Sequence, residues 1–165
     1  MSEQHLEGDE ARKKMQEIAE HQSAMFCTIG DEHVVSTRPM FTQAIDEDGT
    51  FHFFSGRTSN HNQHIAMDVR VTLIYANPSK SEYLAIEGRA DISRDPALIE
   101  RLWTPLVRVW FEDKSDPDLT VLSVTPTAGH YWDTKSNRVV QLVKLAIGAI
   151  VGKPFDDGRE GDLKM

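Results

Sequence analysis

Extended segments separated by tight turns dominate the chain between residues 24 and 93. Five segments have the β-branched and aromatic content typical of strands, and Gly, Asp, Asn or Pro mark most of the turns between them. They are residues 24–29, 34–42, 50–55, 70–76 and 82–93. Strands joined by short turns pair antiparallel, and such a meander must protect its edges. The pattern therefore predicts a mainly β protein of the α+β class, built as a closed or split barrel.

Helical periodicity flanks these strands. A first helix is expected from Asp9, and its apolar stripe consists of Ala11, Met15, Ile18 and Ala19. A second helix is expected over residues 59–68, with Ser59 as its N-cap. Within it, Ile65 and Met67 are predicted to pack inward.

The second half of the chain alternates between the two patterns. Asp95 and Pro96 predict a cap and a first turn of a third helix. Two short strands are expected at residues 120–124 and 129–133, and a last helix at 139–151. Gly88, in the middle of the segment 82–93, predicts a bulge or a close backbone approach.

The chain carries no internal repeat or linker, so we expect one domain over residues 9–155. Residues 1–8 are polar and are predicted to be a disordered N-terminus. Residues 156–165 are predicted to be a polar C-terminal tail.

Charge and composition exclude several classes of function. The net charge of −8 argues against nucleic acid as a partner, because a nucleic-acid-binding surface must be basic. No apolar run approaches the roughly 20 residues that span a bilayer, and no secretion signal precedes the first helix. We expect a cytoplasmic protein without a membrane partner. The single cysteine, Cys27, lies in an apolar run and is interpreted as a buried, inert thiol.

A short polar set in the first half of the chain has the residue types of a phosphate site. Arg38 lies in one predicted strand, Ser55 ends the next, and Ser59 opens the second helix. A helix N-terminus offers free N–H groups and a positive dipole end, and an arginine adds fixed charge. Arg38 could instead pair with a surface carboxylate, and Ser59 could act as a helix cap alone.

Several motifs then follow one another in order along nearly the whole chain. They are Ser36-Thr37-Arg38-Pro39-Met40, Asp48-Gly49, Phe51-His52-Phe53-Phe54-Ser55, Ile86-Glu87-Gly88-Arg89-Ala90, Leu102-Trp103-Thr104-Pro105, Trp110-Phe111, Asp116-Pro117-Asp118-Leu119 and Tyr131-Trp132-Asp133. In this order and spacing the chain resembles the flavin-binding split barrels of the pyridoxamine-5′-phosphate-oxidase-like superfamily. It resembles most closely the general stress protein branch of that superfamily.

The resemblance implies a six-stranded antiparallel split β-barrel with flanking helices. It also implies a homodimer with flavin mononucleotide (FMN) bound between the subunits, FAD being an alternative. Carried over by position, the cofactor contacts are Thr37, Arg38, Pro39, Met40, Gln43, Phe54, Ser55, Ser59, Asn60, His61, Tyr83, Trp110 and Trp132. In this scheme Tyr83 replaces a glutamine that the partner subunit contributes, and Trp110 and Trp132 either stack on the ligand or pack in an interface.

The chain departs from the oxidases proper at the phosphate. Gln43, Asn60 and His61 stand where those enzymes have lysine, arginine and lysine, which leaves Arg38 as the one fixed positive charge. The arginine-containing C-terminal motif that grips pyridoxal phosphate also has no evident counterpart, because Arg159 falls in the predicted tail. Oxidation of pyridoxamine phosphate is therefore not expected.

Two functions remain open at this point. One is an FMN-dependent oxidoreductase acting on a small molecule, with catalytic residues that the sequence does not identify. The alternative is a non-catalytic protein that binds, stores or senses flavin in a stress response. A split barrel that holds haem or deazaflavin is a more distant third. His61 and His64 have no third ligand nearby in sequence, so no metal site is expected.

Overall fold

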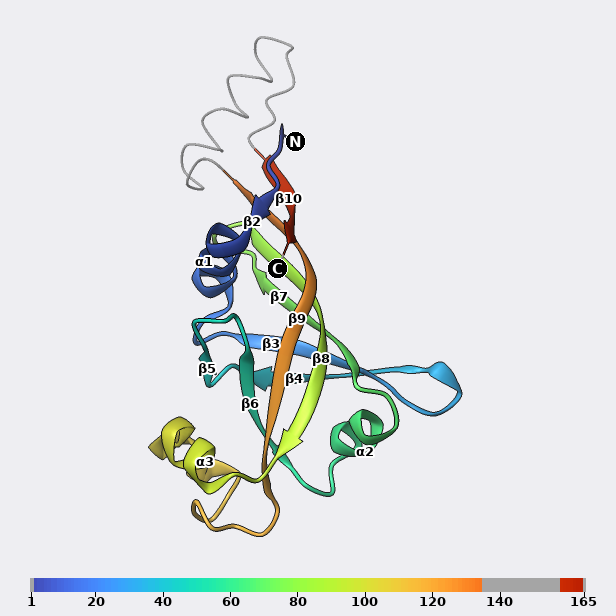
Figure 1. Cartoon of the computed structure of the whole chain (residues 1–165), viewed down its shortest axis with the longest axis vertical. Coiled ribbons are helices and arrows are strands. Elements are labelled where there is room, and N and C mark those ends of the chain that lie inside the picture. Colours follow the sequence, from blue (N-terminus) through green and yellow to red (C-terminus); the bar gives the residue numbers. More distant parts are fainter. Residues whose placement is uncertain (1, 135–157, 165) are drawn as a thin grey trace.

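The computed structural model describes residues 2–134 and 158–164 of the 165-residue chain (Figure 1). The helices are α1 (Gly8–Ala19), α2 (Asn60–Met67), α3 (Pro96–Leu102) and the 3₁₀ helices η1 (Asp31–His33) and η2 (Pro105–Val109). The strands are β1 (Ser2–Glu3), β2 (Leu6–Glu7), β3 (Ser23–Ile29), β4 (Val35–Phe41), β5 (Ala44–Ile45), β6 (Phe51–Gly56), β7 (Arg70–Asn77), β8 (Glu82–Ser93), β9 (Leu119–Thr134) and β10 (Gly158–Lys164). The helix predicted at 139–151 lies outside the described residues.

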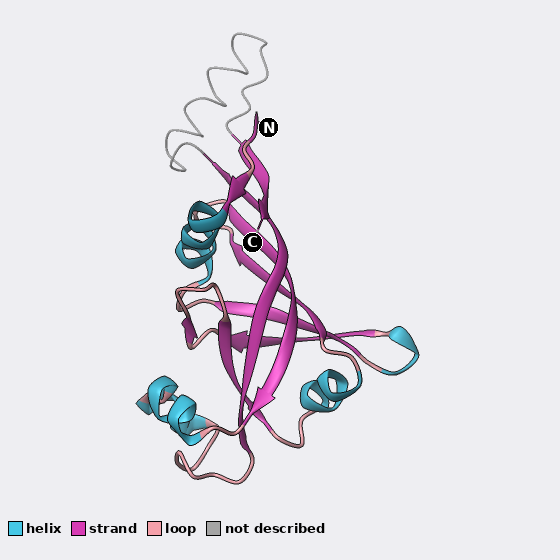
Figure 2. Cartoon of the chain, in the orientation of Figure 1, coloured by secondary structure: helices cyan, strands magenta, loops and turns pink. Residues whose placement is uncertain are grey.

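Strands dominate the described part of the chain, and the mainly β fold is confirmed (Figure 2). All of these strands belong to one sheet, whose main path runs β1-β10-β9-β8-β7-β3-β4. β6 pairs with β5 and with β9, so β9 has β8 along one side and β6 followed by β10 along the other. β1 and β2 pair with β10 in parallel, and the other pairs are antiparallel, which makes the sheet mixed.

The long strand β9 replaces the two short strands that the sequence predicts at 120–124 and 129–133. Pro126 separates those segments, and its lack of an N–H group normally interrupts a central strand. Here Pro126 lies opposite Gly88, where the register of β8 and β9 shifts. A bulge therefore accommodates the proline, and the bulge predicted at Gly88 is confirmed.

Both ends of the described chain form strands, so the prediction of a disordered N-terminus is wrong, and the predicted polar tail contains the strand β10. β10 completes the edge of β9, and β1 and β2 then pair with β10. The Tyr131 hydroxyl donates to the Gln4 carbonyl oxygen at 2.9 Å. Gly161 passes so close to the Gln4 carbonyl that a Cβ at this position would clash with it. The polar composition of these segments is compatible with strands because β1 and β2 form the edge of the sheet and β10 lies next to them.

The helices cover the sheet with the faces that the sequence indicates. The predicted stripe of α1 is buried in full. Ser59 caps α2 by accepting the Asn62 N–H, and Ile65 is buried as predicted. Met67 is 64% exposed, so its predicted inward packing is wrong: it is the last residue of α2 and lies beyond the buried face. No helix of the described part is both long and apolar enough to span a bilayer.

Two apolar clusters pack between the helices and the sheet. The larger lies between α1, α2 and the inner face of the sheet, and it includes the edge-to-face rings of Phe26 and Phe53 with centroids 5.1 Å apart. The smaller joins α3 to the outer faces of β6 and β9 through Ile99, Leu102 and Val121. Trp103, before η2, and Phe111, after it, pack against this second cluster, which holds both ends of η2.

Candidate functional site

A cavity of about 370 Å³ lies where β4, the end of β6, the turn before α2 and η2 meet. Its lining residues are Arg38, Pro39, Met40, Phe41, Gln43, Phe54, Ser55, Gly56, Thr58, Ser59, Val107, Trp110, Phe111 and Asp118. Most of the residues predicted as cofactor contacts are among them. The structure thus brings together Arg38, Pro39, Met40, Gln43, Phe54, Ser55, Ser59 and Trp110, although it does not test what they bind.

The course of the backbone explains why β4 and β6 form one site. β4 is the last strand on its side of the sheet path, and β3 pairs with its other side. Beyond β4, the Gln43 N–H donates to the His52 carbonyl oxygen at 2.9 Å, which carries the chain to β6. The residues at the two strand ends therefore face the same space.

The polar side of the cavity is a chain of hydroxyl contacts at the start of α2. The hydroxyls of Ser55 and Ser59 lie 3.1 Å apart, and the Ser59 hydroxyl accepts the Asn62 N–H at 3.3 Å. The Thr120 hydroxyl donates to the Ser55 carbonyl oxygen at 2.7 Å and accepts from the Asn62 side chain at 2.9 Å. Ser59 is thus both a helix cap and a lining residue, so the two interpretations of it are compatible.

Arg38 is the one positively charged side chain among the residues that line the cavity. It is exposed, and within the described residues its guanidinium has no hydrogen bond or ion pair with the protein. The alternative that it pairs with a surface carboxylate is therefore not observed in this part of the chain. An arginine without a protein partner beside a helix N-terminus is suited to an anion.

His61 lies outside this cavity, in the core beneath α2. Its Nε2 donates to the Phe26 carbonyl oxygen at 3.2 Å, and within the described residues its buried Nδ1 has no hydrogen-bond partner. Burial lowers the pKa of His61, and the nearby charge of Arg38 lowers it further. A neutral, buried ring cannot add charge to a phosphate, so the structure gives no support to His61 as a phosphate ligand.

The buried state of His61 predicts an acid-sensitive stability. A histidine held neutral binds fewer protons in the folded than in the unfolded chain, so the free energy of unfolding falls as the pH drops below the ordinary pKa of 6.5. In a His61→Gln variant this fall should be smaller, measured by denaturant unfolding at about pH 7.5 and about pH 5.5. The exposed His33→Asn serves as the control. An unchanged pH dependence in His61→Gln would contradict the assignment.

The other predicted contacts lie away from the cavity of this chain. Thr37 and Asn60 are exposed and do not line it. Tyr83 and Trp132 lie directly opposite each other on β8 and β9, and Trp132 also pairs with Glu160 of β10. The His130 ring packs on Trp132 with centroids 4.4 Å apart. That Tyr83 serves a partner subunit's site stays a prediction.

Several lining residues were not predicted from the sequence, and Asp118 is the most consequential. It belongs to the motif Asp116-Pro117-Asp118-Leu119, which predicts a turn but does not predict that the turn lies beside the cavity. The pairing of Gly56 with Leu119 on β6 and β9 brings Asp118 next to the turn before α2. Val107 of η2 and Phe111, which follows η2, also line the cavity. Phe111 is held in place by its packing against the second apolar cluster.

Three side chains near α3 have the residue types of a nucleophilic catalytic triad, namely Ser123, His52 and Asp46. His52 contacts the Ser123 hydroxyl at 3.0 Å and the Asp46 carboxylate at 2.7 Å. Arg101 of α3 binds the same carboxylate with both terminal nitrogens, and with His52 it lowers the Asp46 pKa. Neither described cavity is lined by Ser123. We interpret the network as an attachment of α3 to the sheet.

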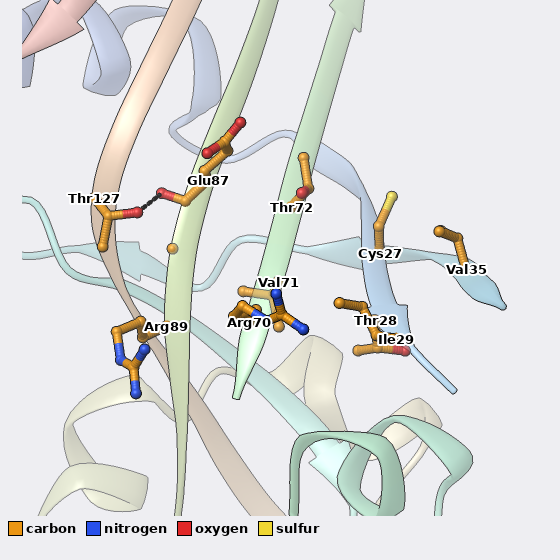
Figure 3. Close-up of a pocket in the computed structure, with 11 residues that line it drawn as sticks. Cys27, Thr28, Ile29, Val35, Arg70, Val71, Thr72, Glu87, Arg89 and Thr127 are labelled. Carbon is orange, nitrogen blue, oxygen red and sulfur yellow. Dashed lines mark hydrogen bonds between the residues drawn. The ribbon is translucent and has the colours of Figure 1, made fainter. Parts of the chain in front are cut away.

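A second groove of about 400 Å³ lies on the outer face of β3, β7 and β8 (Figure 3). Arg70 and Arg89 face each other across β7 and β8, and Arg70 is held by Asp68 through several hydrogen bonds. Cys27 lines the groove, and burial raises the pKa of its thiol, in agreement with the inert thiol expected. None of the predicted cofactor contacts lines this groove. The described residues contain no cluster of three side chains suited to a metal ion.

A family model described as pyridoxamine 5′-phosphate oxidase like matches residues 9–156. The protein bli-3 of Neurospora crassa is 24% identical over 111 residues, which are 62% of this chain and 53% of that protein. The match thus spans about half the length of this curated relative.

Two solved structures are similar in fold. One from Jannaschia sp. CCS1, named for general stress protein 26, aligns with a TM-score of 0.72 and 19% identity, covering 93% of this chain and 96% of that chain. The general stress FMN/FAD binding protein of Xanthomonas citri aligns with a TM-score of 0.65 and 24% identity, covering 77% and 90%.

Proposed function

The chain belongs to the pyridoxamine 5′-phosphate oxidase-like family, and from that premise we propose that its cavity between β4, β6 and η2 binds FMN. The observation that carries the proposal is the convergence of Arg38, without a protein partner in the described chain, and the helix cap Ser59 on one cavity. The Xanthomonas citri relative is named for FMN and FAD binding, which supports the same cofactor here. FAD is the alternative ligand.

The barrel is part of this proposal. Six strands follow one another in the order β6-β9-β8-β7-β3-β4, and the Gln43–His52 hydrogen bond links the two ends of that series. We propose that these six strands form the split barrel of the family. The cofactor would then lie at the opening between β4 and β6.

A homodimer would complete the site. Large apolar side chains on the outer faces of β3, β4, β7 and β8 are exposed, namely Met25, Phe41, Ile74 and Tyr83. A contiguous apolar face is typical of a surface that is covered in the assembly. Tyr83 and Trp132 do not line the chain's own cavity, which supports a role in the cavity of a partner.

Within the cavity, the residues of the chain have separable roles. Arg38 and the hydroxyl of Ser59 would hold the phosphate, and the apolar side chains of Met40, Phe54 and Trp110 would enclose the ring and exclude water. The bound flavin itself supplies the electron-transfer chemistry. Orientation of the flavin and the electrostatics around it would be the protein's contribution.

The substrate is not expected to be pyridoxamine phosphate. Arg159 donates two hydrogen bonds of 2.9 Å to the buried carboxylate of Asp133, and it is therefore occupied in the fold. We propose an oxidoreductase acting on another small molecule. A non-catalytic flavin-binding protein is the second candidate, favoured by the low positive charge of the cavity.

Two measurements separate these functions. The visible spectrum of the purified protein, before and after incubation with FMN and desalting, should show retained flavin rather than a haem or deazaflavin spectrum. Reduction by NAD(P)H, followed by reoxidation with small acceptors, should then exceed the rate of free flavin. Retained flavin without such turnover would reject the enzyme and leave the binding protein. A protein that retains no flavin would reject both.

A further inference from the structure

The cavity carries a negative charge as well as a positive one. Among its lining residues, Arg38 and Asp118 are the charged side chains, so within the described residues the charges of the lining cancel. The phosphate of FMN is a monoester and carries a charge of about −1.5 to −2 near neutral pH. A cavity built for such a group is expected to have a net positive lining.

The Asp118 carboxylate also occupies donors that an anion would otherwise use. Its Oδ1 accepts the Thr58 N–H at 3.2 Å and the Thr58 hydroxyl at 3.3 Å. Thr58 immediately precedes Ser59, the cap of α2. The Asp118 carboxylate thus lies just before the N-terminus of α2, where an external anion would otherwise bind.

The backbone around Gly56 fixes this arrangement. The Asp118 carbonyl oxygen accepts the Arg57 N–H at 2.6 Å, and the Asp118 N–H donates to the Asp116 carboxylate at 2.9 Å. The second carboxylate oxygen lies 2.7 Å from the position that a Cβ of residue 56 would take, so a larger residue there would displace the carboxylate. Asp118 has no ion pair with a cationic side chain in the described part of the chain.

We propose that Asp118 determines the flavin preference of the cavity by opposing a dianionic phosphate. The inference rests on the proposed function. Its consequence is that riboflavin, which ends in a hydroxyl, binds nearly as well as FMN. A carboxylate accepts a hydrogen bond from a hydroxyl, whereas it repels a phosphate at the same position. Arg38 and Asp118 then act in opposite directions on the phosphate and leave the isoalloxazine unaffected.

The test is a comparison of FMN and riboflavin binding to the full chain and its Asp118→Asn variant. Asparagine keeps the oxygen that accepts from Thr58 and removes the charge. We expect the dissociation constant of FMN to fall about tenfold in Asp118→Asn and that of riboflavin to change by less than about twofold. The matched control is Asp91→Asn, which removes an exposed carboxylate of β8 away from the cavity and should leave both constants within about twofold.

A second measurement needs no variant. With cancelling charges, the affinity of the unmodified chain for FMN should change by less than about threefold between roughly 0.05 M and 0.5 M salt. FMN binding that is unchanged in Asp118→Asn, or equal tightening of both flavins, would overturn the role of Asp118 while the flavin site stands. A steep loss of FMN affinity with salt would overturn it too. A chain that binds neither flavin would reject the proposed function itself, and this inference with it.

Discussion

Replacing Arg38 with glutamine is expected to weaken FMN binding about thirtyfold to a hundredfold, because the cavity loses the only cationic side chain of its described lining. A hydrogen bond to a charged group contributes about 1.5–3 kcal/mol. In this variant no other cationic side chain of the described lining replaces that bond, and the phosphate still faces Asp118. Riboflavin lacks the phosphate, so its dissociation constant should rise by less than about threefold. Titration of each flavin against the quenching of its fluorescence measures both constants.

Arg94→Gln is the matched control for this prediction. Arg94 is exposed, follows β8 and does not line the cavity, so the variant loses the same charge elsewhere. Its FMN affinity should stay within about twofold of the unmodified chain. Equal affinities of Arg38→Gln and the unmodified chain for FMN would place the phosphate somewhere other than beside Arg38.

The second prediction concerns the stability of the fold, which depends on the ion pairs that Asp133 forms with α1 and β10. Asp133 is 4% exposed in its side chain and binds Lys14 of α1 at 2.8 Å and Arg159 of β10 at 2.9 Å. Asp133→Asn leaves two partly buried cations without their shared counter-charge. Removal of one partner from a buried ion pair costs about 3–5 kcal/mol. We expect the free energy of unfolding to fall by about 3 kcal/mol, measured by denaturant titration.

Glu17→Gln is the control for this second prediction. Glu17 is the other carboxylate beside Lys14, at 3.1 Å, but its side chain is 61% exposed. An exposed pair contributes little, so this variant should change the free energy of unfolding by less than about 0.5 kcal/mol. A loss below about 1 kcal/mol in Asp133→Asn would show that β10 is held by other contacts.

The sequence was sufficient to predict the elements that depend on local pattern. The limits of β8, the stripe of α1 and the cap at Ser59 follow from periodicity and from side-chain preferences near helix ends. The convergence of Arg38 and Ser59 on one cavity was also predicted, because motifs in a fixed order imply a fixed topology.

What could not be predicted depends on partners distant in sequence. β10 consists mainly of polar and glycine residues, and it is a strand because β9 offers it an edge and Asp133 offers Arg159 a counter-charge. Pro126 stays inside β9 only because Gly88 allows a bulge opposite it. In both cases tertiary contacts override the local preference.

The site shows the same division. His61 was expected at the phosphate from its position in the motif, but it lies on the buried face of α2 and its ring contacts Phe26 in the core. Asp118 lies 59 residues after Ser59, and only the pairing of β6 with β9 brings it to the cavity. Position along a motif therefore predicts which backbone lies at a site, and less securely which side chains enter it.

A crystal structure of the protein grown with FMN tests the central claim most directly. We expect flavin density in the cavity between β4, β6 and η2, with the phosphate beside Arg38 and Ser59 and with one cavity used per chain. Flavin density at any other place, such as the groove that Arg70 and Arg89 line, would contradict it. So would an empty cavity in crystals grown with FMN in large molar excess over the protein.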